Sequence, residues 1–170
     1  LNKVALLITQ TGGGCRATNY IAFIRKALKD MGLGHIPVIS LSVSGLESNP
    51  GFKPTVSMIN SAIKALAFGD LFMRVLYRTR PYELEAGSAD KLYEKWNEKC
   101  KDVLSCSSSR LYDNTVKSIV EEFDNLPLKD IVKPKVGLVG EILVKFHPTA
   151  NNNVVDIVES EGAEAVMPDL

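Results

Sequence analysis

The chain has 170 residues, of which 45% are hydrophobic and 24% charged, and its 20 basic side chains balance its 20 acidic ones. This is the composition of a globular domain, and without a basic excess we expect no nucleic-acid partner. No apolar run approaches the roughly 20 residues of a membrane-spanning helix, and no secretory leader is visible. Three cysteines are too few for a disulfide framework. We therefore expect a cytoplasmic protein without a membrane partner.

The first 53 residues have the pattern of a β-α-β unit. Residues 3–9 form a continuous apolar run, which is typical of a strand buried on both faces. Residues 15–32 have apolar side chains at helical spacing, and residues 36–43 predict a second strand. Because such crossovers are right-handed, the two strands are expected to pair in parallel.

The middle of the chain predicts helices. Thr55 is a candidate cap for a long helix over 56–80, which Pro81 would end. Apolar residues nearly surround this helix, so we expect it to be well buried. Two more amphipathic helices are predicted over 88–104 and 109–126.

The last part predicts a second β-α-β unit, with a strand over 131–144, a helix over 152–162 and a strand over 163–168. We expect both units to share one three-layer Rossmann- or flavodoxin-like α/β fold, with a mainly parallel sheet of about four strands. The chain would then be a single α/β domain, and a segment of a longer protein. Its parts would be a β-α-β unit at 1–53, a helical insertion at 54–127 and a β-α-β unit at 128–170.

The stretch TQTGGGCRATNY joins the first predicted strand to the first helix. A glycine-rich turn before a helix binds anions, and the backbone of Gly12, Gly13 and Gly14 is a candidate for such a site. The phosphate-loop ending Gly-Lys-Ser/Thr is missing, because Cys15 and Arg16 stand there. A helix N-terminus and Arg16 both favour the thiolate of Cys15, the form that binds metal or attacks. The alternatives are a buried structural cysteine and a phosphate site.

A second unusual stretch, KVGLVGEILVKFHPTANN, covers 135–152. Gly137 and Gly140 interrupt a strand pattern, which suggests close approach of a neighbour or a ligand. Glu141 and His147 follow, and they are candidate catalytic residues beside a cofactor contact at Gly140. If the first and third strands were adjacent, Cys15 and Glu141 would face one cleft. The alternative is that Glu141 caps a helix or pairs with the arginine after Cys15.

Two other features have a plain structural interpretation. Cys100 and Cys106 are six residues apart, which is not a helical neighbour spacing, and CSSS resembles a helix end followed by a cap. The sequence YRTRPYE places Arg78 and Arg80 beside tyrosines, a combination that would grip phosphate but is more typical of an amphipathic helix end.

Three stretches together resemble a known family: ITQTGGGCRATNYIAFIRKALKDMG, GDLFMRVLYRTRPYE and KVGLVGEILVKFHPTANNNVVDIVESEGAEAVMPDL. They are similar to CoA-substrate-specific enzyme activase and acyl-CoA dehydratase activase-related proteins and, more distantly, to 2-hydroxyacyl-CoA dehydratase components. The resemblance covers almost the whole chain. In this superfamily an ATP-hydrolysing activator passes a low-potential electron to an acyl-CoA dehydratase whose Rossmann-like lobes hold a [4Fe–4S] cluster. The resemblance implies that Cys15 is a cluster ligand, with the glycines admitting the cluster.

The chain also departs from this family. No second cysteine stands at a comparable strand–helix junction, and the actin-like ATPase motifs of the activator are missing. We therefore expect the segment alone to be inactive, with the remaining ligands supplied by other domains of the parent chain or by a partner. The parent would be either a dehydratase or its activator, with an acyl-CoA as a candidate ligand. Two alternatives are a non-catalytic docking or scaffold lobe and a flavodoxin-like thiol or phosphate-ligand domain.

Overall fold

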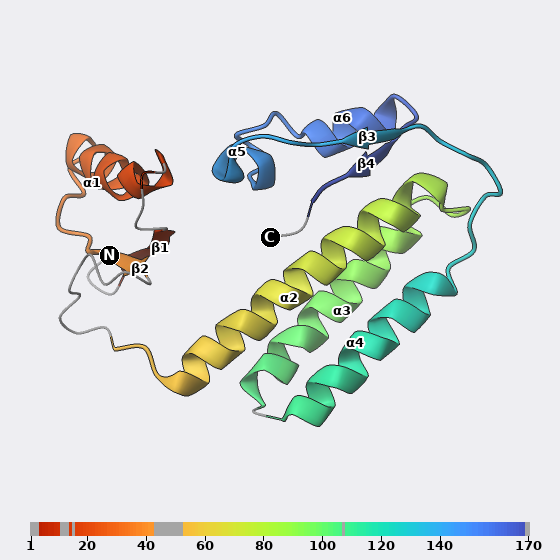
Figure 1. The fold of residues 1–170 in the computed structure, drawn as a ribbon, viewed down its shortest axis with the longest axis horizontal. Helices are drawn as coiled ribbons and strands as arrows, with labels where there is room; N and C mark the ends of the chain where they lie inside the picture. The colour runs from red at the N-terminus through yellow and green to blue at the C-terminus, as the bar shows by residue number, and fades with distance from the viewer. Residues whose placement is uncertain (1–3, 11–13, 15, 43–52, 107, 169–170) are drawn as a thin grey trace. The chain divides into compact units, whose positions relative to one another are not determined.

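A computed structural model describes residues 4–10, 14, 16–42, 53–106 and 108–168 of the chain (Figure 1). Of the residues described, 59% are in helices and 11% in strands, so helix packing rather than a central sheet organises this part of the chain. The chain divides into two compact units, Leu1–Pro54 and Thr55–Leu170. Each unit is described by itself below.

The first unit contains a β-α-β arrangement. Strand β1 (Leu6–Gln10) leads through the short 3-10 helix η1 (Arg16–Asn19) to α1 (Tyr20–Asp30), and β2 (Val38–Ser42) follows. β1 and β2 pair in parallel, with Leu6 opposite Val38, which confirms the predicted parallel pair. Among the residues of this unit that the structure describes, the buried apolar ones are Ala17, Ile21, Ile36 and Val38.

Three antiparallel helices dominate the second unit: α2 (Val56–Thr79), α3 (Ser88–Ser105) and α4 (Ser109–Asp124). The hydroxyl of Thr55 accepts a hydrogen bond from the N–H of Met58 at 3.1 Å, which confirms the predicted cap of α2. Pro81 lies in the 3-10 turn η2 (Arg80–Tyr82), where α2 ends as predicted. The sequence therefore specified these helices through local signals.

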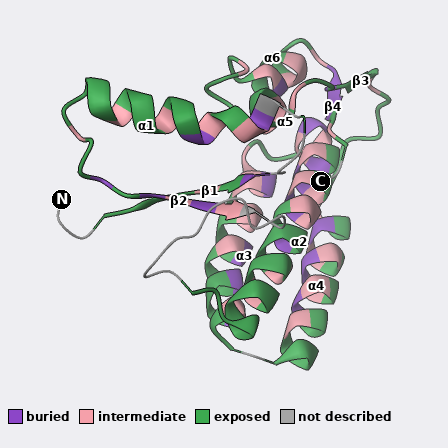
Figure 2. Cartoon of the chain, turned by 60° about the vertical axis from the view of Figure 1, so that its left-hand side comes forward, coloured by how far each residue is buried: buried purple, intermediate pink, exposed green. Residues whose placement is uncertain are grey.

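The helices enclose one apolar core (Figure 2). Its buried residues are Phe68, Phe72, Leu76, Ala89, Trp96, Cys100, Val103, Ile119 and Phe123. The expectation that α2 is buried all round is wrong, because its buried residues all lie in its second half. In the first half, Val56 is 85% exposed and Ile63 61% exposed. α3 and α4 pack against the side of α2 that holds these buried residues.

The end of the chain differs from the predicted strand over 131–144. Strand β3 is only Lys135–Gly137, and residues Ile142–Phe146 form the short helix α5. Helix α6 (Val154–Ser160) and strand β4 (Glu164–Val166) follow, and β4 pairs with β3 in parallel. The strand prediction failed because Glu141 caps α5 and so starts a helix inside the apolar run.

The predicted fold class, a three-layer Rossmann- or flavodoxin-like α/β fold with one sheet of about four strands, is therefore wrong. The strands that the structure describes form two separate two-stranded sheets, β1 with β2 and β3 with β4. The physical reason lies in the predicted insertion. Its three helices have a hydrophobic core of their own, so they form the main part of the second unit instead of packing onto a sheet as an insertion.

Candidate functional site

The glycine-rich stretch connects the carboxyl end of β1 to a helix. β1 ends at Gln10 and η1 begins at Arg16. The side-chain amide of Gln10 is buried and donates a hydrogen bond to the carbonyl of Thr18 at 3.0 Å, which ties the strand end to η1. Gly14 is exposed, and a Cβ placed on it would meet no described atom within 4 Å.

Three of the predicted site residues in this stretch, Gly12, Gly13 and Cys15, lie outside the described residues. The backbone of Arg16 is described as the first residue of η1, but its side chain is not. The proposed roles of the glycine backbone in anion or cofactor binding, and of Cys15 as a metal ligand, therefore stay predictions.

Glu141 has a structural role in the second unit. Its Oε2 accepts hydrogen bonds from the N–H groups of Leu143 at 3.0 Å and Val144 at 3.1 Å. These are the first free donors of α5, so the carboxylate acts as the helix cap that we considered as an alternative. Gly140 precedes it with φ of +156°, and a Cβ there would meet no described atom within 4 Å. The same is true of Gly137, so no described neighbour requires these glycines.

His147 ends α5 and is exposed. Its Nδ1 accepts a hydrogen bond from the N–H of Ala150 at 3.3 Å. Asn151 bridges the same turn, because its Nδ2 donates to the carbonyl of Lys145 at 3.0 Å and its Oδ1 accepts from the N–H of Val154 at 3.2 Å. These polar side chains thus build the connection between α5 and α6, and a catalytic role of Glu141 or His147 stays a prediction.

The predicted residues fall into different units. Cys15 belongs to the first unit and Glu141 to the second. The shared cleft was expected on the condition that β1 and β3 are adjacent in one sheet, and because the described strands form two separate sheets, that basis is lost. Within the part of the chain that the structure describes, no group of three or more His, Cys, Asp or Glu residues is placed to hold a metal ion. The second unit therefore offers no described metal centre of its own.

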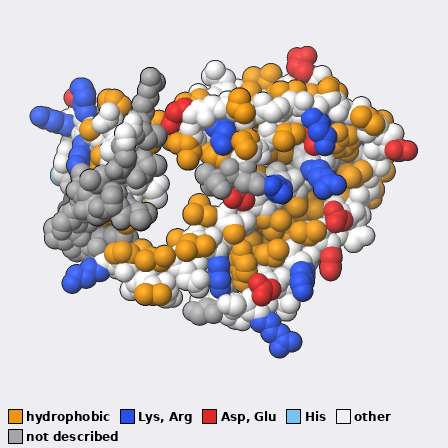
Figure 3. Space-filling model, viewed as in Figure 1, with side chains coloured by type: hydrophobic (Ala, Val, Ile, Leu, Met, Phe, Trp, Pro, Cys, Tyr) orange, Lys and Arg blue, Asp and Glu red, His pale blue; other side chains and the backbone are white. Residues whose placement is uncertain are grey.

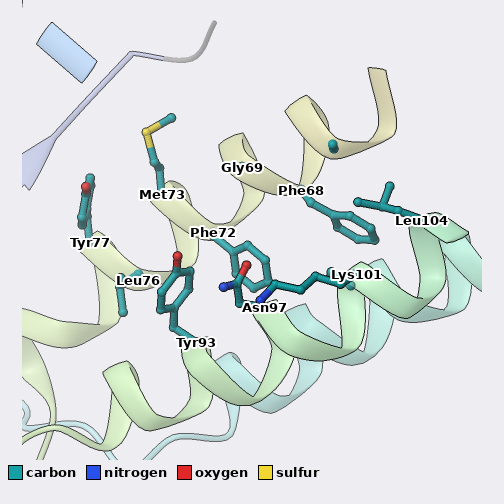
Figure 4. Close-up of a pocket in the computed structure, with 12 residues that line it drawn as sticks. Phe68, Gly69, Phe72, Met73, Leu76, Tyr77, Tyr93, Asn97, Lys101 and Leu104 are labelled. Atoms are coloured by element: carbon teal, nitrogen blue, oxygen red, sulfur yellow. The ribbon is translucent and has the colours of Figure 1, made fainter. Parts of the chain in front are cut away.

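A cavity of about 300 Å³ lies between α2 and α3 in the described part of the second unit (Figure 4). Sequence analysis missed it. Phe68 and Phe72 of α2 form its floor, and Asn97 and Lys101 of α3 add polar groups. The full lining is Ala65, Phe68, Gly69, Phe72, Met73, Leu76, Tyr77, Tyr93, Asn97, Cys100, Lys101 and Leu104. The surface is suited to apolar contact with a few hydrogen bonds at its rim.

Cys100 lines this cavity but is not a reactive thiol. It is 4% exposed, and burial raises the pKa of its thiol to about 11. A thiol with such a pKa is protonated at neutral pH and is neither a good nucleophile nor a ready metal ligand. Cys106 is exposed at the end of α3, where its N–H donates to the carbonyls of Asp102 and Val103. Both cysteines thus have the ordinary structural positions that we predicted.

A second cavity of about 260 Å³ shares the lining residues Met73, Leu76, Tyr77 and Tyr93 with the first, so the two are neighbours. It extends from α2 to the α5–α6 region, where Lys145 and Phe146 line it. The unusual stretch over 135–152 therefore contributes to a concave surface through Lys145, Phe146, Pro148 and Asn151, and Glu141 is not among the lining residues. Sequence patterns of single elements contain no signal for this groove, because it depends on how the elements pack.

Arg80 is the centre of an ion-pair network. Its Nε and Nη2 donate to the two carboxylate oxygens of Glu159 at 2.7 and 3.1 Å, and its Nη1 donates to Asp90 at 3.2 Å. Burial alone would lower the pKa of Arg80, but these carboxylates outweigh it and raise the pKa. The network links η2, which follows α2, to α3 and α6. The interpretation of YRTRPYE as a phosphate grip loses support, because carboxylates already engage this guanidinium.

Helix α2 has a further property. Residues Val56–Tyr82 are long and apolar enough to cross a membrane, with a mean hydropathy of 1.3, and 11% of the tested window is buried. The core helix of a soluble protein passes the same test of length and composition.

Comparisons with protein-family models, with curated proteins and with solved structures found no match.

Proposed function

We propose that the chain is a segment of a CoA-substrate-specific enzyme activase-related or 2-hydroxyacyl-CoA dehydratase-like protein. In this proposal the first unit supplies Cys15 as one thiolate ligand of a [4Fe–4S] cluster. The observation that supports it is the parallel β1–β2 pair with the GGGC stretch between β1 and η1. Ligands of open α/β sheets bind at the carboxyl ends of parallel strands, which is where this stretch follows β1.

The donor set of this chain fits such a cluster only in part. Iron–sulfur clusters are held by several cysteine thiolates. The described residues contain no three-donor group, and Cys100 is buried in the helical core. Other parts of the parent protein would therefore supply the remaining ligands. When bound, such a cluster supplies low-potential electron transfer, while this chain contributes one thiolate and glycines that leave space beside it.

Anaerobic purification of the parent protein tests the proposal. We expect iron and sulfide in the parent, a marked loss of both in Cys15→Ala, and no loss in the control Cys106→Ala. The isolated 170-residue chain should be colourless and should show neither ATPase nor dehydratase activity. An iron-replete isolated chain, or a Cys15→Ala parent with full iron content, would contradict the proposal.

The acidity of Cys15 gives an independent test. A helix N-terminus and the adjacent Arg16 favour a thiolate, so we expect an apparent pKa below the ordinary value of about 8.5. The measurement is the rate of alkylation against pH in a variant with Cys100 and Cys106 replaced by serine. A pKa at or above the ordinary value would contradict the thiolate role.

A docking lobe is the second candidate function, and it concerns the unit Thr55–Leu170. It is favoured by the exposed apolar side chains that the second unit itself presents on α2, such as Ile63, and by the cavity between α2 and α3 (Figure 3 shows hydrophobic side chains gathered over the helices of this unit). Exposed apolar patches larger than a few hundred Å² mark interaction surfaces. In the parent protein, Ile63→Lys should weaken co-purification with the ATP-hydrolysing activator. Val132→Lys, at a residue 99% exposed outside α2, is the matched control.

A further inference from the structure

The second cavity, of about 260 Å³, has an apolar wall to which several elements contribute. Met73 and Tyr77 lie one turn apart on α2 and extend on the same side of it (Figure 4). Tyr93 of α3 and Phe146 of α5 also line the cavity. Flat and polarizable side chains of this kind favour an aromatic ligand, because rings pack well on one another and on methionine sulfur.

The charged side chains that line the second cavity differ in their partners. Arg80 and Asp156 pair with each other at 3.6 Å, and Arg80 also pairs with Glu159. Lys145 differs, because no carboxylate in the part of the chain that the structure describes forms an ion pair with it. Its ammonium lies 4.0 Å from the centre of the Phe146 ring, which lines the same cavity. A cation at an apolar wall without a counter-ion favours an anionic group on the ligand.

The turn between α5 and α6 holds this lysine in place. Asn151 donates to the carbonyl of Lys145 and accepts from the N–H of Val154, so it fastens the last turn of α5 to the start of α6. Asn153 precedes α6 with φ of +54°, in the left-handed region, yet its side chain makes no cap bond to the helix. Asn153 lines the cavity instead, where its amide can donate to an anion. A few polar groups beside an apolar wall are the usual composition of a small-ligand site.

We propose that the second cavity binds a small monocarboxylate with one aromatic ring, with its carboxylate at Lys145 and Asn153 and its ring beside Tyr77. The volume sets the size of the ligand, because about 260 Å³ is just below the roughly 300–1,000 Å³ of cavities that hold drug-sized molecules. A single ring with a short acid chain is therefore preferred over a larger molecule. Every lining residue belongs to the unit Thr55–Leu170, so the proposal goes beyond both proposed functions and does not depend on a cluster in the first unit.

Titration of the isotopically labelled 170-residue chain with hydrocinnamate, followed by amide NMR, tests the proposal. We expect saturable shift changes in the amides of Met73–Tyr77 and Lys145–Asn153. The dissociation constant should be on the order of 0.3 mM, because a ligand this small makes few contacts. Hydrocinnamyl alcohol keeps the ring and lacks the carboxylate, so it should bind about tenfold more weakly.

Two variants with matched controls locate the contacts. Lys145→Gln should weaken hydrocinnamate binding about tenfold and leave binding of the alcohol nearly unchanged. Lys99→Gln is its control, because Lys99 also lies over an aromatic ring, 4.4 Å from the centre of Trp96, but lines neither of the two cavities. Met73→Trp should fill the cavity and abolish binding, whereas Leu84→Trp, at a residue 59% exposed outside both cavities, should not.

Several outcomes would overturn the proposal. No saturable shifts at millimolar hydrocinnamate, or shifts confined to other amides, would show that the cavity is not the site. Equal affinity for the acid and the alcohol, or equal effects of Lys145→Gln and Lys99→Gln, would refute the carboxylate contact. Undiminished binding to folded Met73→Trp would refute the position of the ring. If the amide spectrum shows that Met73→Trp is unfolded, the two lysine variants alone decide the outcome.

Discussion

The two units of the chain bury apolar side chains to very different extents. In Thr55–Leu170 the core is continuous, and Ile119 and Phe123 are 0% and 1% exposed. In Leu1–Pro54 the strand β1 has the apolar sequence of a strand covered on both faces, yet Leu7 is 51% exposed. Parallel sheets are stable when helices or further strands cover both faces. The comparison teaches that the helical unit contains its own folding core, whereas two strands and one helix leave β1 half covered.

The largest expected effect comes from the helical core. Phe123→Ala should lower the free energy of unfolding by about 3–5 kcal/mol, because it removes a fully buried ring and leaves a cavity. Urea denaturation followed by Trp96 fluorescence measures this effect. The control Val132→Ala should change the free energy by less than about 0.5 kcal/mol. A loss below about 1 kcal/mol for Phe123→Ala would mean that the helical unit lacks the packed core described above.

The Arg80 network should be the next most important contribution. Arg80→Met leaves Glu159, whose side chain is 13% exposed, without its bidentate partner, and should cost about 2–3 kcal/mol. Lys26→Met removes an exposed ion pair with Asp30 in α1 and should cost less than about 0.5 kcal/mol. Thermal unfolding of both variants makes the comparison, and equal effects would show that burial does not distinguish the two ion pairs.

A smaller effect is expected in the first unit. Ile21→Ala should cost about 1–2 kcal/mol, less than a fully enclosed side chain would, because few buried residues surround it. The unit division predicts that hydrogen exchange quickens in α1 while the amides of α2–α4 keep their protection. Faster exchange in both units would show that they unfold together and would remove the basis of the comparison.

The smallest predicted effect concerns pH. Partial burial raises the pKa of Glu83, but the N–H groups of Ala89 and Gly87 and the hydroxyl of Ser88 outweigh it and hold the pKa below its usual value. A lowered carboxyl pKa stabilises the fold above the unfolded-state pKa of about 4.3, and this contribution is lost as pH falls through the folded-state pKa. Glu83→Gln should therefore cost about 1 kcal/mol at pH 7 and progressively less below about pH 4. If Glu83→Gln lowered the free energy of unfolding equally at pH 7 and below about pH 4, this role of the Glu83 carboxylate would be contradicted.

The parts of the fold that the sequence predicted are those with local causes. The Thr55 cap, the Pro81 stop and the spacing of apolar residues locate α2 without any knowledge of its neighbours. Whether strands far apart in the sequence pair in one sheet is a non-local property. The prediction that all four strands share one sheet was wrong. The strand over 131–144 failed because an apolar run fits strand and short helix equally well, and the capping contact of Glu141 decided between them.

The candidate site shows the same division. The capping alternative for Glu141 was available from the sequence because a cap and its helix are neighbours in the chain. The cavity between α2 and α3 could not be predicted from the sequence, because it depends on the distance between two packed helices. The partner of Arg80 was hidden for a related reason, because Glu159 is 79 residues away.

The burial of Cys100 has a practical consequence for measuring motion. In a variant with Cys15 and Cys106 replaced by serine, Cys100 is the one remaining thiol, and its side chain is 4% exposed where the helical core meets the cavity between α2 and α3. Its labelling rate by a thiol reagent, corrected for the fraction of thiolate, would then report how often the helices around Cys100 open in the native state. Cys100, to which we assign no chemical role, thus serves as a built-in probe of how often its surroundings in the core open.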